Sequence, residues 1–274
     1  MAKKAKSVSK KTTKTQTETK VVSAKSSTKA MATISTSIQV LREMSLVGIV
    51  ISEFVGTFIL VAVLLYTGFS PLYGAIALVG IILATSRLTS AHLNPAMTIG
   101  AFVNRKIDAV YAVGHILSQF LGGIVAFFAL DAFSKGSLAS GAVATTNNLA
   151  HAAIMPAGKE WYIFAAELIG ALILSFGFAA ALNAKKDKVN AALSYGFVYI
   201  AAAVVAMQAS SSFIDSTKNT GYAVLSFINP AAAAAANGLS WSVWPIAIYV
   251  VAPAVAAIIG IAVYDFVQSQ PSEE

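Results

Sequence analysis

The tripeptide Asn-Pro-Ala occurs twice in this chain, as Asn94, Pro95 and Ala96 and again as Asn229, Pro230 and Ala231. Asparagine is a favoured helix N-cap, and proline suits the first helical position because its missing N–H would have no partner there. Each tripeptide therefore predicts the start of a short helix, one ending near residue 103 and one near residue 237. A helix of about nine residues is roughly 13 Å long, which is about half of what a bilayer requires.

A helix that begins inside a membrane presents unpaired backbone N–H groups and the positive end of its dipole. Irregular backbone is tolerated at that depth only where protein covers it or where it lines a water-filled cavity. Two such helix ends meeting at the bilayer midplane would create a pore with hydrogen-bond donors at its centre. The amides of Asn94 and Asn229 could then donate to a passing oxygen and interrupt proton relay, while the dipole ends repel cations. Helix capping alone is the simpler interpretation, and the two are compatible.

Two carboxylates, Glu53 and Glu167, stand at matching places in apolar sequence. A charge inside a membrane is costly, so such groups rarely lack a role. A proton relay is one interpretation. Their symmetric placement favours another, in which each carboxylate accepts backbone N–H groups of the loop ahead of one tripeptide and so holds that loop.

The composition places these motifs in a membrane protein. Of the 274 residues, 57% are hydrophobic and 11% are charged, whereas soluble domains carry about 25% charged residues. No cysteine is present, which excludes disulfides and thiolate chemistry. The three histidines form no close cluster with acidic residues, and we find no nucleophile–base pair or phosphate-binding loop. We therefore predict no metal, no cofactor and no enzymatic activity.

Six apolar segments predict membrane spans. They cover approximately residues 46–68, 72–86, 109–130, 161–182, 191–209 and 243–267. The segments Glu53–Leu60 and Glu167–Leu174 are alike, and each half of the chain places its tripeptide after its second span. Three spans per half give the halves opposite orientations. Residues 46–131 and 161–267 therefore form an inverted repeat, with its site expected at the interface between the repeats.

Residues 1–44 are rich in Lys, Ser and Thr and have the composition of a disordered tail. The membrane domain then covers residues 45–268, and residues 269–274 form a short C-terminal tail. With the N-terminus inside, 16 of the 19 Lys and Arg residues lie on the cytoplasmic side. This predicts a multi-pass protein of the cell membrane with both termini cytoplasmic. The lysines of the tail fix the orientation, or they bind anionic lipid headgroups or nucleic acid.

The paired tripeptides, with the sequence Ser90–Leu93 ahead of the first, resemble the aquaporin or major intrinsic protein family. The resemblance covers residues 46–267. It implies an all-α membrane protein with six transmembrane helices and two re-entrant half-helices. It also implies a passive channel for water or small neutral solutes such as glycerol, assembled as a homotetramer in the lipid bilayer. By the same resemblance Glu53 and Glu167 hold the re-entrant loops, and His92 is a loop-bracing or vestibule residue.

The chain departs from the family where the outer constriction of the pore is expected. Ala232 follows the second tripeptide, where the family has an arginine. The family spacing puts Gly74 at a position usually held by an aromatic residue, and it puts Ala203 at the corresponding place in the fifth span. Three small side chains predict a wide, apolar constriction, unless the ring of Phe227 refills it.

The markers of solute preference conflict, so water and glycerol both remain open. Ala233 stands where glycerol-conducting members often have an acid, and Tyr249 is typical of water channels whereas Val250 is not. Two other functions also fit the sequence. A coupled secondary transporter uses the same inverted repeats and broken helices, but it would need a titratable or ion-binding group facing the pore. A non-conducting membrane protein is favoured by the missing arginine.

Overall fold

The computed structural model describes residues 46–85, 91–139, 149–184, 187–216, 218–219 and 222–271. The predicted basic tail, residues 1–44, lies outside the described residues. The chain divides into two units, residues 1–47 and residues 48–274, and the contacts reported below belong to the second unit.

Helices form nearly all the regular structure of the described residues. The first helix, Leu46–Tyr66, is followed by α2 (Pro71–Thr85), α3 (Pro95–Val103), α4 (Ala109–Ala139), α5 (Glu160–Asn183), α6 (Lys188–Ser211), α7 (Pro230–Ala235), α8 (Val243–Ile246), the π-helix η1 (Ala247–Val251) and α9 (Ala252–Gln268). Two short strands, β1 (His151–Ala152) and β2 (Ala223–Val224), pair in parallel. The all-α architecture predicted from the sequence is thus confirmed, apart from this two-residue pairing.

Within the described residues, five helices are long and apolar enough to cross a membrane. They are Leu46–Tyr66, Ala109–Lys135 within α4, α5, α6, and the continuous run Val243–Gln268 through α8, η1 and α9. The predicted second span corresponds to α2, which has 15 residues and is shorter than the other five. At 1.5 Å per residue α2 is about 22 Å long, less than a bilayer core of about 30 Å.

The two short helices begin where the tripeptides predict. Helix α3 starts at Pro95 and ends at Val103, as expected, whereas α7 starts at Pro230 and ends at Ala235, two residues before the expected end near residue 237. Both are too short to span a bilayer, so they have the length of half-helices.

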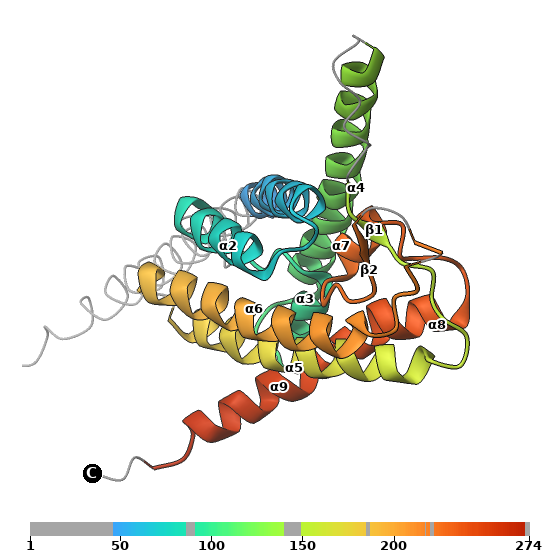
Figure 1. Cartoon of the computed structure of the whole chain (residues 1–274). Helices are drawn as coiled ribbons and strands as arrows, with labels where there is room; N and C mark the ends of the chain where they lie inside the picture. The colour runs from blue at the N-terminus through green and yellow to red at the C-terminus, as the bar shows by residue number, and fades with distance from the viewer. Residues whose placement is uncertain are drawn as a thin grey trace, which may run out of the picture. The chain divides into compact units, whose positions relative to one another are not determined.

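The half-helices pack against helices of the opposite half of the chain. Helix α3 contacts α9, and α7 contacts α4, while α5 lies beside α6 and α9 (Figure 1). Glycines, which have no side chain, permit both half-helix contacts. A Cβ on Gly100 of α3 would lie 2.8 Å from the Cβ of Ala257, and one on Gly123 of α4 would lie 2.9 Å from the carbonyl oxygen of Ala231. Small residues allow such close helix approach in membranes, so glycine helps to interlock the two halves.

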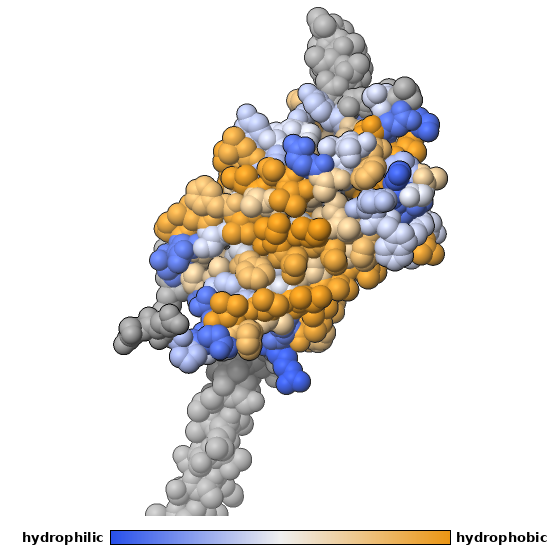
Figure 2. All heavy atoms as spheres, turned by 60° about the horizontal axis from the view of Figure 1, so that its bottom comes forward, coloured by the Kyte–Doolittle hydropathy of each residue, from blue (hydrophilic) through white to orange (hydrophobic). Residues whose placement is uncertain are grey.

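The exterior carries many large apolar side chains. Figure 2 shows hydrophobic residues gathered over much of one face, with hydrophilic residues toward its two ends. On the helix surfaces Leu117 and Phe128 of α4 are 65% and 63% exposed, and Phe197 of α6 is 63% exposed. An apolar surface of this extent fits contact with lipid rather than with water.

Candidate pore site

Each tripeptide caps its own half-helix through the asparagine side chain. The N–H of Ala96 donates to Asn94 Oδ1 over 2.9 Å, and the N–H of Ala231 donates to Asn229 Oδ1 over 3.0 Å. Both asparagines have extended backbone, with φ near −155° and −151°, as N-cap residues require. Both are nearly fully buried, at 2% and 4% exposure. Pro95 and Pro230 follow at the first helical positions.

The same two side chains also join the halves of the chain to each other. Asn94 Nδ2 donates to the carbonyl oxygen of Ile228 over 2.8 Å, and Asn229 Nδ2 donates to that of Leu93 over 2.9 Å. Each of these bonds links residues more than 130 positions apart. The N-termini of α3 and α7 therefore lie next to each other. An amide nitrogen carries two hydrogens, so one on each asparagine is not used by the cross-link.

The residues just ahead of the asparagines have an unusual backbone. Leu93 and Ile228 both have left-handed φ values, 54° and 48°. This conformation costs a non-glycine residue about 1–2 kcal/mol. It occurs at equivalent positions of the two halves, where the two carbonyls accept the crossing amide bonds. Nothing in the residue types at these positions predicts it.

Glu53 and Glu167 lie at equivalent positions and contact equivalent groups. Glu53 accepts the N–H of His92 at Oε1 and that of Leu93 at Oε2, both over 2.8 Å. Glu167 accepts the N–H of Phe227 at Oε1 and, over 2.8 Å, that of Ile228 at Oε2. Both carboxylates are fully buried. Each therefore contacts the two residues that precede an asparagine of the pore site.

The surroundings of the two carboxylates differ. Glu53 also accepts from Gln119 Nε2 over 2.6 Å, and His115 Nδ1 lies 3.1 Å from Glu53 Oε1. The ring of His115 stacks on that of His92, with centroids 4.2 Å apart, and His92 Nδ1 lies 3.1 Å from Thr98 Oγ1. Beside Glu167 the additional donor is the hydroxyl of Ser226, over 3.0 Å.

His92 is fully buried in this network. His115 and Gln119 were not anticipated as part of the site. Their spacing of four residues within an apolar span, which places both on one face of α4, is the signal that could have revealed them. Among the residues that the structure describes, no group of three or more His, Asp or Glu side chains is arranged to hold a metal ion.

Of the residues expected at the outer constriction, the structure brings two to the lining of one small cavity. Ala203 and Phe227 line a cavity of only about 10 Å³, hereafter the neck cavity. The space opposite Gly74 is taken by a ring from α6, because a Cβ on Gly74 would lie 2.5 Å from Cε1 of Tyr199. Ala232 is fully buried and is not part of the cavity lining. That these residues set the width of the pore stays a prediction, and the sequence did not indicate that the ring of Tyr199 lies beside Gly74.

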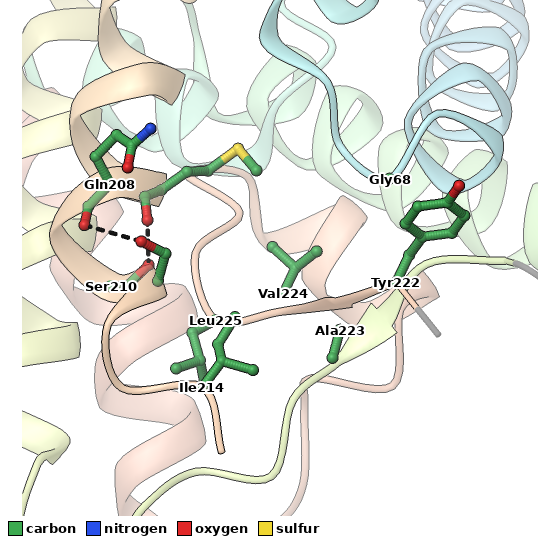
Figure 3. A pocket seen from close by; sticks show the side chains of 10 residues that line it. Gly68, Gln208, Ser210, Ile214, Tyr222, Ala223, Val224 and Leu225 are labelled. Carbon is green, nitrogen blue, oxygen red and sulfur yellow. Dashed lines mark hydrogen bonds between the residues drawn. The ribbon is translucent and has the colours of Figure 1, made fainter. Parts of the chain in front are cut away.

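A larger pocket of about 230 Å³, hereafter the mouth pocket, lies at the C-terminal end of α6. Figure 3 shows Gln208 and Ser210 of α6 on one side of it and Tyr222 and Val224 on the other. Met207 lines both this pocket and the neck cavity. The two spaces therefore adjoin at that side chain.

The architecture and the paired half-helices define a class of membrane channel proteins. Residues 40–264 match the family described as Major intrinsic protein, and the chain belongs to that family. The resemblance predicted from the sequence is thereby confirmed, and the protein is a multi-pass membrane protein.

Several characterised proteins are similar to this chain. The Glycerol uptake facilitator protein-like 6 of Lactiplantibacillus plantarum is 28% identical over 76% of the chain and 93% of the relative. Aquaporin AqpM of Methanothermobacter marburgensis is 26% identical over 71% of the chain and 74% of the relative. Aquaporin PIP1-1 of Zea mays is 30% identical, and the alignment spans 64% of the chain and 66% of the relative.

A solved structure shares the fold. The X-ray structure of the aquaglyceroporin from Plasmodium falciparum superposes with a TM-score of 0.59 and 20% sequence identity. The superposition covers 82% of this chain and 97% of the other. At this identity the likeness speaks for the fold alone.

Proposed function

We propose that the protein is a passive transmembrane channel for water, for small neutral solutes such as glycerol, or for both, and that it excludes protons and ions. The observation that carries this proposal is the meeting of two asparagine-capped half-helices. Their N-termini are tied together by the crossed bonds from Asn94 to Ile228 and from Asn229 to Leu93. The positive dipole ends of α3 and α7 and the two asparagine amides therefore lie together at the interface between the halves of the chain.

The second amide hydrogen of each asparagine supplies the chemistry. A water that accepts from the amides of both Asn94 and Asn229 directs its own hydrogens away from them, so neighbouring waters cannot hand a proton through it. The adjacent N-termini of α3 and α7 raise the electrostatic cost of a cation at the same point. A neutral solute pays no such cost.

Glu53 and Glu167 act as positioning residues for the asparagines. The support is that each fully buried carboxylate accepts two N–H groups of one re-entrant loop. A proton relay through them is disfavoured because these contacts tie each carboxylate to its loop. The buried N–H of His92 takes part in the same bracing.

The remaining assignments rest on the sequence and the family. Both termini face the cytoplasm and the chain resides in the cell membrane, because 16 of 19 Lys and Arg residues then lie inside. Residues 1–44 form a basic tail that can bind anionic lipid headgroups, residues 45–268 form the channel domain, and residues 269–274 form a short C-terminal tail. The protein assembles as a homotetramer, and it works without a cofactor and without catalysing a reaction.

Stopped-flow light scattering on proteoliposomes tests the proposal. Wild-type protein should raise osmotic water permeability well above that of empty vesicles, and Asn229→Leu should abolish most of this gain because it removes both the cap and the crossing donor. Asn183→Leu, at an exposed position at the end of α5, is the matched control and should conduct normally. Saturable uptake driven by an ion gradient would instead support a coupled transporter. No permeability above lipid would support a non-conducting protein.

A further inference from the structure

Aromatic rings line the neck cavity, although three of the residues expected at the outer constriction have small side chains. Tyr199 stands where a side chain at position 74 would lie, since a Cβ there would be 2.9 Å from the tyrosine oxygen. Tyr199, Ala203 and Met207 follow one another at intervals of four residues on α6, so they form one face of that helix. This face is one wall of the neck cavity.

Phe227 also lines the neck cavity, and its ring is held in place by its neighbours. Its ring contacts those of Phe69 and Tyr249 edge to face, with centroid distances of 5.0 Å and 5.1 Å. Its backbone N–H donates to Glu167, and the residue is only 3% exposed. Edge-to-face packing on two sides leaves the ring little freedom to swing out of the cavity.

The neck cavity offers room for about one water molecule. Its volume is about 10 Å³, near the minimum of about 10–15 Å³ that a water requires. The lining is largely apolar, and the hydroxyl of Ser226 is already bonded to Glu167. A polyol in this space would leave several hydroxyl groups without partners, whereas a water can keep its neighbours in the file before and after it.

The mouth pocket differs from the neck cavity both in volume and in the polarity of the residues that line it. At about 230 Å³ it is large enough for a polyol-sized solute, and the polar residues Gln208, Ser211 and Tyr222 are among those that line it. Met207 lines both this pocket and the neck cavity, so the two spaces lie next to each other at that side chain. A solute that moves from the mouth pocket into the neck cavity at this point passes Met207.

We infer that Phe227, Tyr199 and Met207 make this channel selective for water, with glycerol-sized solutes admitted to the mouth pocket but stopped at the neck cavity. This inference rests on the proposed channel function. It names three specificity-determining residues, two of which lie on α6 outside the positions where the sequence predicted a constriction.

The test measures water and glycerol permeability separately in the same proteoliposomes. Wild-type protein should raise water permeability and leave glycerol permeability at the level of empty vesicles. Phe227→Ala should raise the glycerol-to-water ratio by about tenfold or more, equivalent to lowering the glycerol barrier by about 1.4 kcal/mol. Met207→Ala should change the ratio in the same direction, and it keeps the test valid if Phe227→Ala fails to fold.

Two exposed residues of α6 provide matched controls. Phe197→Ala and Val204→Ala remove side chains that are 63% and 42% exposed, and both should leave the ratio unchanged. Wild-type protein that conducts water and glycerol alike would overturn this inference while leaving the channel function intact. So would unchanged ratios in both Phe227→Ala and Met207→Ala. Wild-type protein that conducts neither would overturn the proposed function itself, and this inference with it.

Discussion

Removing the Glu167 carboxylate tests whether it holds the second re-entrant loop. Glu167→Leu leaves the N–H groups of Phe227 and Ile228 without acceptors, while the Ser226 hydroxyl can rotate toward another partner. An unpaired buried donor costs about 1–3 kcal/mol, so two cost about 2–6 kcal/mol. Typical proteins have a total stability of about 5–15 kcal/mol. The leucine variant should therefore fold poorly, or fold with a displaced loop and little conduction.

Glu167→Gln separates bracing from charge. The amide oxygen can still accept, but the amide nitrogen then faces a backbone N–H, so about half of the stabilisation is lost. The assay is thermal unfolding in detergent followed by water permeability in vesicles, with Glu160→Gln in the first turn of α5 as the control. The expected order of stability is wild type, then glutamine, then leucine. A leucine variant that melts with the wild type and conducts normally would refute the bracing role.

Three further predictions concern the rest of the chain. Mercuric ion should not inhibit water flux, because the chain contains no cysteine; inhibition reversed by a thiol would mean that another protein carries the flux. Gly122→Ala should lower the melting temperature, because its Cβ would lie 2.5 Å from the carbonyl oxygen of Phe54, whereas Gly80→Ala, which meets no atom within 4 Å, should not. Trypsin added outside sealed right-side-out vesicles should spare residues 1–44 despite their nine lysines, and cleavage there would reverse the proposed orientation.

The centre of the site could be anticipated because its determinants are local. An Asn cap followed by Pro specifies a helix start within three residues, and the structure starts α3 and α7 there. The pairing of Glu53 with one loop and Glu167 with the other could be anticipated for a different reason. Both halves repeat the same order of carboxylate, second span and tripeptide. This repeated order predicts that the contacts of the two carboxylates are repeated as well.

The lining of the neck cavity could be anticipated only in part: Ala203 and Phe227 were expected near the constriction, whereas Tyr199 depends on a contact between distant segments. A glycine at position 74 predicts a gap only if no neighbour fills it, and the neighbour is Tyr199, on a helix more than a hundred positions away. The stacking of His92 on His115 is hidden for the same reason. The sequence shows that position 74 has no side chain, whereas the packing of α2 against α6 determines which ring fills the space.

The two bracing carboxylates have different consequences for the pore, despite their matching positions. Glu53 holds His92 and Leu93, neither of which lines the neck cavity, and a network with His115 and Gln119 surrounds it. Glu167 holds Phe227, whose ring is a wall of that cavity. In the second half, therefore, one carboxylate contacts both the loop ahead of the capped asparagine and a residue that lines the neck cavity. If the bracing and the selectivity are as proposed, the two are coupled in the second half and separate in the first.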